Sequence, residues 1–402
     1  MSILQNKNIL IGISSSIAAF KIVGLVRQLK KENANVKIAL SENAKKLISP
    51  KEFRCEIVTE LFLRGYDYRK YLEKKKFVHI DLNRWADVIL LAPATANLIG
   101  KIANGIADDL LSTIVITHKK DVLIAPAMNM DMYENPIVRK NMNILAKEGY
   151  RFIPPKYGIL ACEDAGMGKL EEPDKIMEEL KEYFIYRAQL KGKKILVTAG
   201  ATSEEIDAVR VITNKSSGKM GIALAEEASK RGAEVTLVRA HTAIEPKAKL
   251  KDIIANSANE MASKIKENKN QDVIIHAAAV SDFSVNKKDK KIDSQKSLHL
   301  ELTPTTKILE NIKKWNKDVF LVGFKAEYKA AEKELIRKAF EKLKKSSADL
   351  IVANDVGKES RGFGTDTNEV FLVDKNSKVM HIPLLPKQEV AKRILDKVME
   401  MQ

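Results

Sequence analysis

The chain has 402 residues, 45% of them hydrophobic and 30% charged, which is the composition of a globular protein long enough for two domains. No apolar run approaches the roughly 18 residues of a membrane helix and no signal peptide is recognisable, so we expect no membrane contact and a cytoplasmic location. The formal net charge is +16, but lysines and acids are intermixed and no RNA-binding motif is present, so the charge favours anionic small substrates over nucleic acid.

Residues 7–41 begin with a β-rich apolar run and a small-residue turn, followed by a helix with apolar spacing of three and four and a second strand. This βαβ pattern is typical of a doubly wound parallel sheet, which binds ligands at the C-terminal ends of its strands. The turn from Gly12 to Ser16 carries three hydroxyls where a dinucleotide-binding fold has glycines. Hydroxyls and amides can hold a phosphate monoester, which favours FMN over NAD, but a serine-rich helix cap explains the pattern equally well.

Polar residues follow two further strands of the first half. Residues 93–97 (PATAN) come after the strand VILLA, and Asn129 comes after the strand VLIAPA, while His79 stands at the head of an earlier segment. The ends of neighbouring strands are where a cofactor and a substrate carboxylate are held in such folds. A lone histidine at a helix start is more often structural, and an asparagine in a turn usually serves the backbone. The prediction of a site therefore rests on the order of these elements along the chain and not on any single residue.

The stretch GILACEDAGMGKL contains Cys162, one of two cysteines in the chain. A disulfide framework and a zinc site are not expected, because Cys55 and Cys162 are not at C-x-x-C spacing and the six histidines are scattered. The thiol is then either structural or chemically active. The glycines around it predict a flap that folds over substrate.

A second βαβ opening, residues 193–240, follows a segment with helical periodicity. We place the boundary near residue 190, which gives domains 1–190 and 191–402. The predicted fold class is α/β, with two doubly wound Rossmann-like domains of which the first is flavodoxin-like and the second ligase-like. A two-domain Rossmann pyridine-nucleotide oxidoreductase is the alternative, although neither first strand is followed by G-x-G-x-x-G.

The second half carries a polar loop, Asn214–Lys219, whose amides, hydroxyls and ammonium groups suit a polyphosphate or a carboxylate, although it is not a P-loop. Ala277–Ala279 follow the buried strand DVIIH. These small side chains either let a flat ring approach closely or serve tight packing between helix and sheet. Asp282 can then bind a base, a ribose or a metal. A lysine run from Lys287 to Lys291 is a candidate lid, although most charge runs are solvated.

The first half resembles the FMN-dependent phosphopantothenoylcysteine decarboxylase half of the bifunctional coenzyme A biosynthesis family. The elements GISSSIAAFK, HIDL, APATAN, APAMN and ACEDAGMGKL occur in the family's order. Two positions depart from it, with Tyr133 in place of Trp and Ser14–Ser16 in place of Thr-Gly-Gly. The resemblance implies FMN as cofactor, with contacts from Ser14, Ser15, Ser16, Ile17, Ala18, Ser41, Pro93, Ala94, Thr95 and Asn97.

For the decarboxylase, the resemblance implies that flavin oxidises the substrate thiol to a thioaldehyde, which lets CO₂ leave before the ene-thiol is protonated and reduced. His79 matches the acid/base beside flavin and thiol. Asn129 matches the residue that holds the carboxylate, and Cys162 matches the proton donor of the reductive half.

The string TAGATSEEIDAVRVITNKSSGKMG, followed by HAAAVSDF, VGFKAE and VANDV, resembles phosphopantothenate–cysteine ligase, the second half of the same family. It implies that 4′-phosphopantothenate is activated by CTP with Mg²⁺ as an acyl-cytidylate and then captured by cysteine. Asn214 matches the residue that handles the acyl-cytidylate. Substrate and nucleotide contacts are implied at Arg210, Lys215, His276, Ala277, Ala278, Asp282, Lys291, Lys307, Phe324 and Lys342.

The resemblance also implies a homo-oligomer, because decarboxylase halves form trimers and ligase halves form dimers, contacts that together could build a dodecamer. The sequence leaves open whether CTP is preferred over ATP or UTP. It also leaves open which lysine serves the lid, since only part of the family's lysine pattern is present around Lys291.

Overall fold

A computed structural model describes residues 2–61, 77–119, 121–159, 165–293 and 298–402 of the chain. The chain divides into two compact units, Met1–Ile185 and Tyr186–Gln402, which are described separately below. Within the described ranges, no helix combines the length and the apolar character that crossing a membrane requires.

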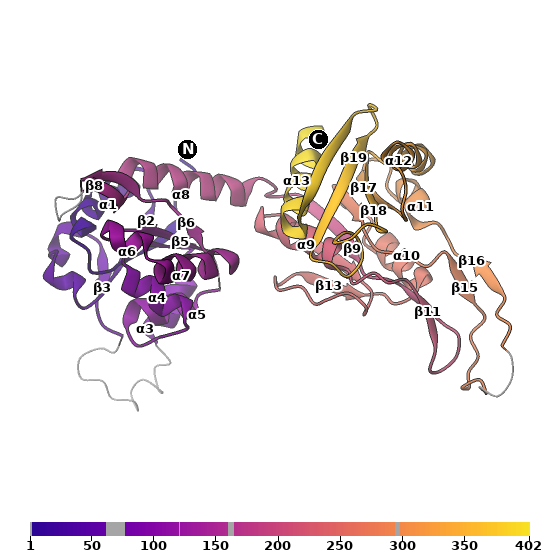
Figure 1. The fold of residues 1–402 in the computed structure, drawn as a ribbon, viewed down its shortest axis with the longest axis horizontal. Coiled ribbons are helices and arrows are strands. Elements are labelled where there is room, and N and C mark those ends of the chain that lie inside the picture. The colour runs from indigo at the N-terminus through magenta and orange to yellow at the C-terminus, as the bar shows by residue number, and fades with distance from the viewer. Residues whose placement is uncertain (1, 62–76, 120, 160–164, 294–297) are drawn as a thin grey trace. The chain divides into compact units, whose positions relative to one another are not determined.

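The first unit is a six-stranded, all-parallel sheet in the order β3-β2-β1-β4-β5-β6 (Figure 1). Its strands are β1 (Asn8–Ile13), β2 (Asn35–Leu40), β3 (Glu56–Val58), β4 (Val88–Ala94), β5 (Val122–Pro126) and β6 (Arg151–Phe152). Its helices are η1 (Ile17–Phe20), α1 (Lys21–Lys31), η2 (Ala44–Lys46), η3 (Pro50–Phe53), α3 (Val78–Trp85), α4 (Ala96–Ala103), α5 (Leu110–Thr117), α6 (Met130–Glu134), α7 (Pro136–Lys147) and α8 (Pro173–Ala188).

Alternation along the buried strands builds a core on each side of this sheet. Ile9 and Ile11 of β1 point into a cluster with α1 and α8, whereas Leu10 points into a second cluster with α3, α4 and α5. Strands buried on both faces read as continuous apolar runs, which is why VILLA and ILIGI were recognisable in the sequence. A separate antiparallel hairpin, β7 (Lys156–Ile159) with β8 (Ala165–Lys169), precedes α8.

The second unit repeats the same plan. Its eight-stranded sheet has the order β13-β12-β9-β14-β17-β18-β19-β20, parallel through β18 and antiparallel beyond it. Its strands are β9 (Lys194–Ala199), β12 (Glu234–Arg239), β13 (Lys251–Ile254), β14 (Val273–His276), β17 (Phe320–Glu327), β18 (Leu350–Asp355), β19 (Thr367–Asp374) and β20 (Val379–Pro386).

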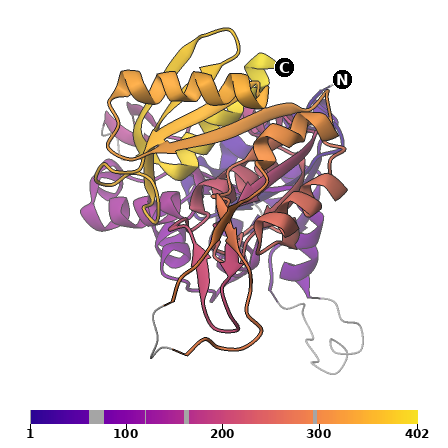
Figure 2. The same ribbon diagram turned by 90° about the vertical axis from the view of Figure 1, so that its right-hand side faces the viewer.

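Helices cover both faces of this sheet. On one face lie α9 (Lys219–Lys230) and α13 (Lys387–Met401), which pack against each other; on the other lie α10 (Ala258–Glu267), α11 (Ile308–Trp315) and α12 (Glu332–Ser346). Two antiparallel ribbons extend from the unit and touch each other (Figures 1 and 2). They are β10 (Ser203–Glu205) with β11 (Val211–Thr213), and β15 (Phe283–Val285) with β16 (Leu302–Pro304).

The predicted pair of doubly wound Rossmann-like domains is confirmed. Numbered along the chain, the six parallel strands of each unit have the order 3-2-1-4-5-6, so the topological switch point lies between β1 and β4 in the first unit and between β9 and β14 in the second. The flavodoxin-like description of the first domain does not fit this connectivity, because flavodoxin has the order 2-1-3-4-5.

Candidate functional site

Three strand ends of the first unit meet at the predicted flavin residues. Ser14 follows β1 and is almost fully buried; its Oγ donates to the carbonyl of Pro93 at 2.7 Å and accepts from the amide of Thr95 at 2.9 Å. Ser16 caps η1 by accepting from the amide of Ala18 at 3.3 Å. The hydroxyls of Ser14 and Ser16 thus make structural hydrogen bonds, whereas Ser15 is exposed.

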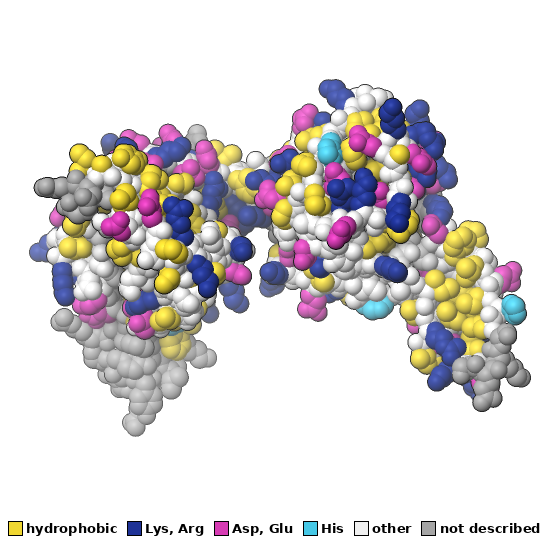
Figure 3. Space-filling model, viewed as in Figure 1, with side chains coloured by type: hydrophobic (Ala, Val, Ile, Leu, Met, Phe, Trp, Pro, Cys, Tyr) yellow, Lys and Arg dark blue, Asp and Glu magenta, His cyan; other side chains and the backbone are white. Residues whose placement is uncertain are grey.

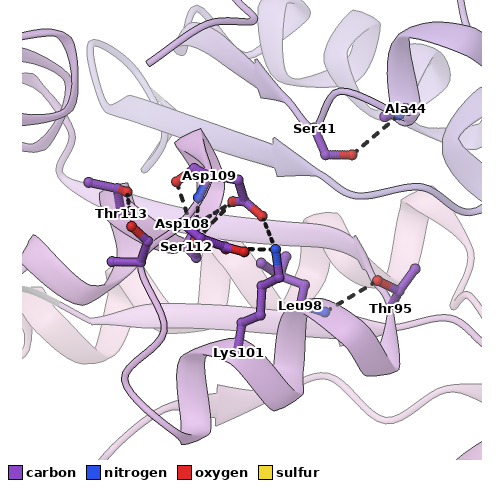
Figure 4. Close-up of polar contacts among 10 residues, drawn as sticks. Ser41, Ala44, Thr95, Leu98, Lys101, Asp108, Asp109, Ser112 and Thr113 are labelled. Carbon is purple, nitrogen blue, oxygen red and sulfur yellow. Dashed lines mark hydrogen bonds and ion pairs between the residues drawn. The ribbon is translucent and has the colours of Figure 1, made fainter. Parts of the chain in front are cut away.

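The neighbouring turns are capped in the same way. Thr95, after β4, accepts from the amide of Leu98 at the start of α4, and Ser41, after β2, accepts from the amide of Ala44 (Figure 4). Pro93 and Ala94 are buried at the end of β4, while Asn97 and Ile17 are exposed. Because β2, β1 and β4 are adjacent and parallel, these turns lie at one edge of the sheet.

An ion-pair cluster that the sequence did not reveal fixes α4 against α5. The Nζ of Lys101 contacts Asp108 and Asp109, each at 2.7 Å, and Asp109 forms a capping box with Ser112 at the start of α5 (Figure 4). Burial raises the pKa of Asp109, but hydrogen bonds from Lys101 and Ser112 outweigh it and hold that pKa below the usual value. The carboxylate therefore stays charged and keeps the two helices in register.

The β7–β8 hairpin lies directly against the turn that holds Asn129. Asn129 caps α6, with its Oδ1 accepting from the amide of Asp131 at 2.7 Å, and Gly168 accepts from the amide of Met128 at 3.0 Å. A Cβ on Gly166 would lie 2.3 Å from Sδ of Met130, so only glycine allows this approach. The predicted flap therefore has a hairpin base beside Asn129.

Two further catalytic residues were predicted for this unit. Cys162 stands in sequence between β7 and β8 and lies outside the described residues. His79 is half-buried in the first turn of α3, its ring centroid 6.3 Å from that of Phe77. Within the described ranges His79 makes no hydrogen bond to the other predicted residues, so its catalytic role stays a prediction.

Replacing Gly168 with alanine should destabilise the hairpin base. Gly168 has φ +135, and a Cβ there would lie 2.3 Å from the carbonyl oxygen of Met128. Forcing a side chain into such a backbone costs about 1–3 kcal/mol. Calorimetry of the full chain should show a lower first-unit melting temperature, whereas Gly24→Ala in α1, where the new Cβ finds 3.9 Å of space, should not lower it. Equal transitions for both variants would contradict the strain argument.

The second unit holds a cavity of about 980 Å³ at the C-terminal ends of β14, β17 and β18, next to the start of α9. It lies at the switch point of the sheet, where open α/β sheets bind ligands. Nine of the eleven residues predicted for the ligase line it, namely Asn214, Lys215, His276, Ala277, Ala278, Asp282, Lys307, Phe324 and Lys342.

The Asn214 loop is tied to the end of β14. The Nδ2 of Asn214 donates to the carbonyls of Ala279 at 3.1 Å and Val280 at 3.3 Å, which brings the loop against the cavity wall. Gly218 ends the loop at φ +71, where a Cβ would lie 2.5 Å from that of Ala243. This glycine lets α9 start immediately, with its N-terminal amides beside the cavity.

His276 is neutral at physiological pH. Its Nδ1 lies 3.0 Å from Oγ1 of Thr198, which also accepts from the amide of Ala278 at 3.0 Å. Burial, with a smaller effect of Lys342, lowers the pKa of His276 to about 4. On the cavity rim, Lys307 forms an ion pair with Asp282. These residues form the part of the cavity wall at which the base and ribose of a nucleotide were predicted to bind.

Arg210 and Lys291 do not line the cavity. Arg210 sits at the end of the β10–β11 turn, where its Nη2 donates to the carbonyl of Ile292 at 3.2 Å and its Nη1 lies 3.5 Å from Asp207. Buried Asp207 also accepts from the amide of Ile292 at 3.1 Å. Arg210 and Lys291, the neighbour of Ile292, are thus held near each other at the ribbons. They lie apart from the nine residues that line the cavity.

Comparisons with known proteins agree with these two units. Residues 2–185 match the family model Flavoprotein, and residues 190–401 match the model DNA/pantothenate metabolism flavoprotein C-terminal domain. The coenzyme A biosynthesis bifunctional protein of Bacillus subtilis is 40% identical over 98% of this chain and 97% of its own, and that of Thermococcus kodakarensis is 41% identical over 99% and 96%. The chain belongs to the family of coenzyme A biosynthesis bifunctional proteins.

Solved structures match one unit each. A C-terminal domain of a coenzyme A biosynthesis bifunctional protein is 38% identical, covering 53% of this chain and 97% of its own at a TM-score of 0.45. A PPC decarboxylase mutant complexed with pantothenoylaminoethenethiol is 28% identical, covering 45% and 99% at a TM-score of 0.41. Family membership confirms a bifunctional enzyme of coenzyme A biosynthesis and does not favour the pyridine-nucleotide oxidoreductase.

Sequence reasoning missed part of the cavity wall in this member of the family. Asn354, Gly362, Phe363, Asn368 and Lys387 line it from β18, β19, their connection and the start of α13. Asn354 lies within the family motif VANDV, but the motif gave it no role at a site. The residues beyond 357 carried no motif, although Pro386 directly before an apolar-periodic segment is a helix-start signal that pointed to Lys387.

Proposed function

We propose that the second unit joins cysteine to 4′-phosphopantothenate with CTP and that the first unit decarboxylates the product with FMN. The cavity that gathers nine predicted ligase residues around Asn214 carries this proposal. The division of the chain into two units after Ile185 is consistent with one activity in each unit. A cytoplasmic location fits a chain that has two cysteines and no disulfide framework.

In the ligase unit, the substrate carboxylate attacks the α-phosphate of CTP, forming an acyl-cytidylate and releasing pyrophosphate. The amine of cysteine then attacks the acyl carbon, and CMP leaves with the bonding electron pair. Asn214 holds the reacting acyl group, while Asp282, Lys307 and Lys342 surround the nucleotide. Mg²⁺ shields the triphosphate during the first attack. Among the described residues no group of three or more His, Cys, Asp or Glu side chains could hold a metal alone, which fits an ion that arrives with the nucleotide.

In the decarboxylase unit, the turns after β2, β1 and β4 fit FMN, because they present amides and exposed Ser15 at the sheet's switch point. Bound FMN supplies the two-electron oxidation of the substrate thiol and the later reduction. Asn129 orients the carboxylate that leaves as CO₂, and its capping bond to Asp131 fixes the direction of the carboxamide. His79 moves the thiol proton, and Cys162 protonates the product carbon.

Replacing Cys162 with serine should let CO₂ leave but stop the reaction before the saturated thiol, because a hydroxyl is a far weaker acid than a thiol. Mass spectrometry of the products should show the unsaturated, decarboxylated thiol. Cys55→Ser, which changes a cysteine packed against the first core, is the matched control and should turn over normally. Normal formation of the saturated thiol by the Cys162 variant would remove the proton-donor role.

A homo-oligomer is also part of the proposal. The ribbons of the second unit expose large apolar side chains, and Figure 3 shows hydrophobic surface gathered over β15–β16. The exposed side chains are Val209, Val211, Phe283, Leu298, Leu300 and Leu302. A patch of this kind on a projecting arm is typical of a subunit contact. Arg210 and Lys291 lie on the same arm, so a partner copy could bring them to a cavity.

The test is to incubate the flavin-loaded chain with 4′-phosphopantothenate, cysteine, Mg²⁺ and either CTP, ATP or UTP. Mass spectrometry should detect the amide, its decarboxylated product and the nucleoside monophosphate, with CTP giving the fastest release. Release of a nucleoside diphosphate instead of the monophosphate would exclude the acyl-nucleotidylate route.

A further inference from the structure

A second, smaller cavity lies in the second unit on the face of the sheet that α12 covers. It measures about 170 Å³ and is lined by the start of α12, the end of β18, the connection from β18 to β19, and the strands β19 and β20. Alternation along β18 separates the two cavities, since Asn354 lines the large one and Asp355 lines the small one. None of the residues predicted for the ligase lines the small cavity.

The carboxylate of Asp355 is buried in the wall of this cavity with one oxygen unpaired. Asp355 is 5% exposed, and its Oδ1 accepts from the amides of Lys329 at 2.8 Å and Gly357 at 2.9 Å. Its Oδ2 is also buried, but it accepts no hydrogen bond from any residue that the structure describes. Because a buried carboxylate oxygen without a donor is costly, we expect a molecule in the cavity to supply one.

Arg361 presents the complementary group in the same cavity. Its Nη1 forms an ion pair with Glu369, which also accepts from Nε2 of His381 at 2.8 Å. The Nε of Arg361 is buried and donates to no residue within the described ranges. Lys358 adds a second positive charge, and it forms no ion pair with the described part of the chain. The cavity therefore offers donors to an anionic group as well as an acceptor to a cationic one.

Charge and size limit what the cavity can hold. Three carboxylates line it, those of Glu332, Asp355 and Glu369, together with the cations Lys358 and Arg361, so the wall suits neither a simple anion nor a simple cation. Among the described residues no group of three or more His, Cys, Asp or Glu side chains could hold a metal ion. A volume of about 170 Å³ corresponds to about five or six water molecules, whereas pockets for drug-sized ligands begin at roughly 300 Å³. A nucleotide is therefore too large, and a small zwitterion fits.

We propose that this cavity binds a small free α-amino acid. The ammonium group of the amino acid donates to Oδ2 of Asp355, and its carboxylate accepts from Nε of Arg361 and lies near Lys358. Its side chain packs against His381 and Phe371, whose stacked rings line the cavity with their centroids 4.6 Å apart. Such a ligand satisfies both buried groups at once and adds no net charge.

The segment that joins β18 to β19 forms part of both cavities. Gly362 and Phe363 line the large cavity, whereas Lys358 and Arg361 line the small one. An amino acid held by Lys358 and Arg361 restrains this segment, and with it one wall of the large cavity. We expect alanine to raise the melting temperature of the second unit, since a ligand that binds only the folded state stabilises it.

Equilibrium dialysis of the full chain with radiolabelled alanine tests the site. Alanine should bind saturably, with one molecule per chain. Ethylamine lacks the carboxylate and propionate lacks the ammonium group, so each should compete about 10- to 100-fold more weakly than unlabelled alanine, the loss of a charge-assisted hydrogen bond. Absence of saturable binding, or competition by either analogue as strong as that by alanine, would overturn the site.

Asp355→Asn should weaken alanine binding by the same factor, because its oxygen can still accept from both amides while an NH₂ group replaces Oδ2. Asp374→Asn is the matched control. Asp374 is 2% exposed and its Oδ1 likewise accepts from two amides, those of Asn376 at 2.9 Å and Lys378 at 3.0 Å, but it does not line the cavity. Equal alanine affinity in these two variants would place the bound alanine elsewhere and contradict the proposal.

Lys358→Met provides a variant that disturbs no buried group, since Lys358 is exposed. It decides the question if Asp355→Asn shows no cooperative melting. Alanine binding should weaken about 2- to 5-fold, as for the loss of an exposed ion pair, and unchanged affinity would overturn the site. These measurements do not use the ligase reaction, so their outcome is independent of the proposed function.

Discussion

Replacing Arg231 with methionine is expected to lower the free energy of unfolding of the second unit by about 3–5 kcal/mol, because it breaks a buried ion-pair network. The Arg231 side chain is fully buried. Its Nε donates to Glu227 at 2.7 Å, its other nitrogens bind Asp396 and the carbonyl of Lys392, and its guanidinium lies 5.0 Å from the Tyr186 ring.

The cluster joins three helices, since Tyr186 belongs to the end of α8, Glu227 to α9, which Arg231 directly follows, and Asp396 to α13. Without the guanidinium, the mostly buried carboxylate of Glu227 loses its counter-charge. Calorimetry should show the second-unit transition lowered by roughly 6–20 °C, as expected for a unit of this size. Lys264→Met, which breaks a solvent-exposed pair with Glu267, should leave the melting temperature of the second unit unchanged. Equal melting of Arg231→Met and the unaltered chain would show that the network is not stabilising.

Replacing Asn214 with aspartate is expected to slow amide formation on the order of 10²- to 10³-fold while acyl-cytidylate accumulates. The change puts a carboxylate oxygen where Nδ2 now donates to the carbonyls of Ala279 and Val280. Two hydrogen-bond acceptors, the new carboxylate oxygen and a backbone carbonyl, would then face each other, so the loop should move away from the end of β14. The acyl group would no longer be held in place when the amine attacks it.

Quenched-flow mass spectrometry with CTP and cysteine measures both species. Asn376→Asp, in the exposed turn between β19 and β20, introduces the same charge away from the cavity and should behave like the unaltered chain. A normal amide yield from the Asn214 variant would remove its assigned role.

The two βαβ units were predictable because their signals are local. Apolar runs such as the one around Ile9 and periodic helices such as α9 fall within about thirty residues and need no distant partner. The ribbons were not predictable, because strands as short as β15 and β16 have almost no period of their own. Their pairing, Ser284 opposite Thr303, joins residues separated by a lysine run that reads as a loop.

The same distinction between local signals and contacts with distant residues applies to single side chains. Ser14 could be read either as a phosphate ligand or as a cap, and only the position of Pro93 near the end of β4 decides that its hydroxyl is engaged. Lys387 carries no motif, and it reaches the cavity because β19 and β20 add antiparallel strands that return the chain to α9. The residues around Asn214 were found because a family motif spans them without interruption.

The bond between Thr198 and His276 determines which ring nitrogen carries the proton. Thr198 is fully buried and already accepts from Ala278, so its hydroxyl hydrogen is satisfied when it is donated to Nδ1 of His276. The neutral imidazole then bears its hydrogen on Nε2. The cavity wall thus contains an uncharged imidazole whose tautomer is set by a buried hydroxyl, because burial lowers the pKa of His276 to about 4.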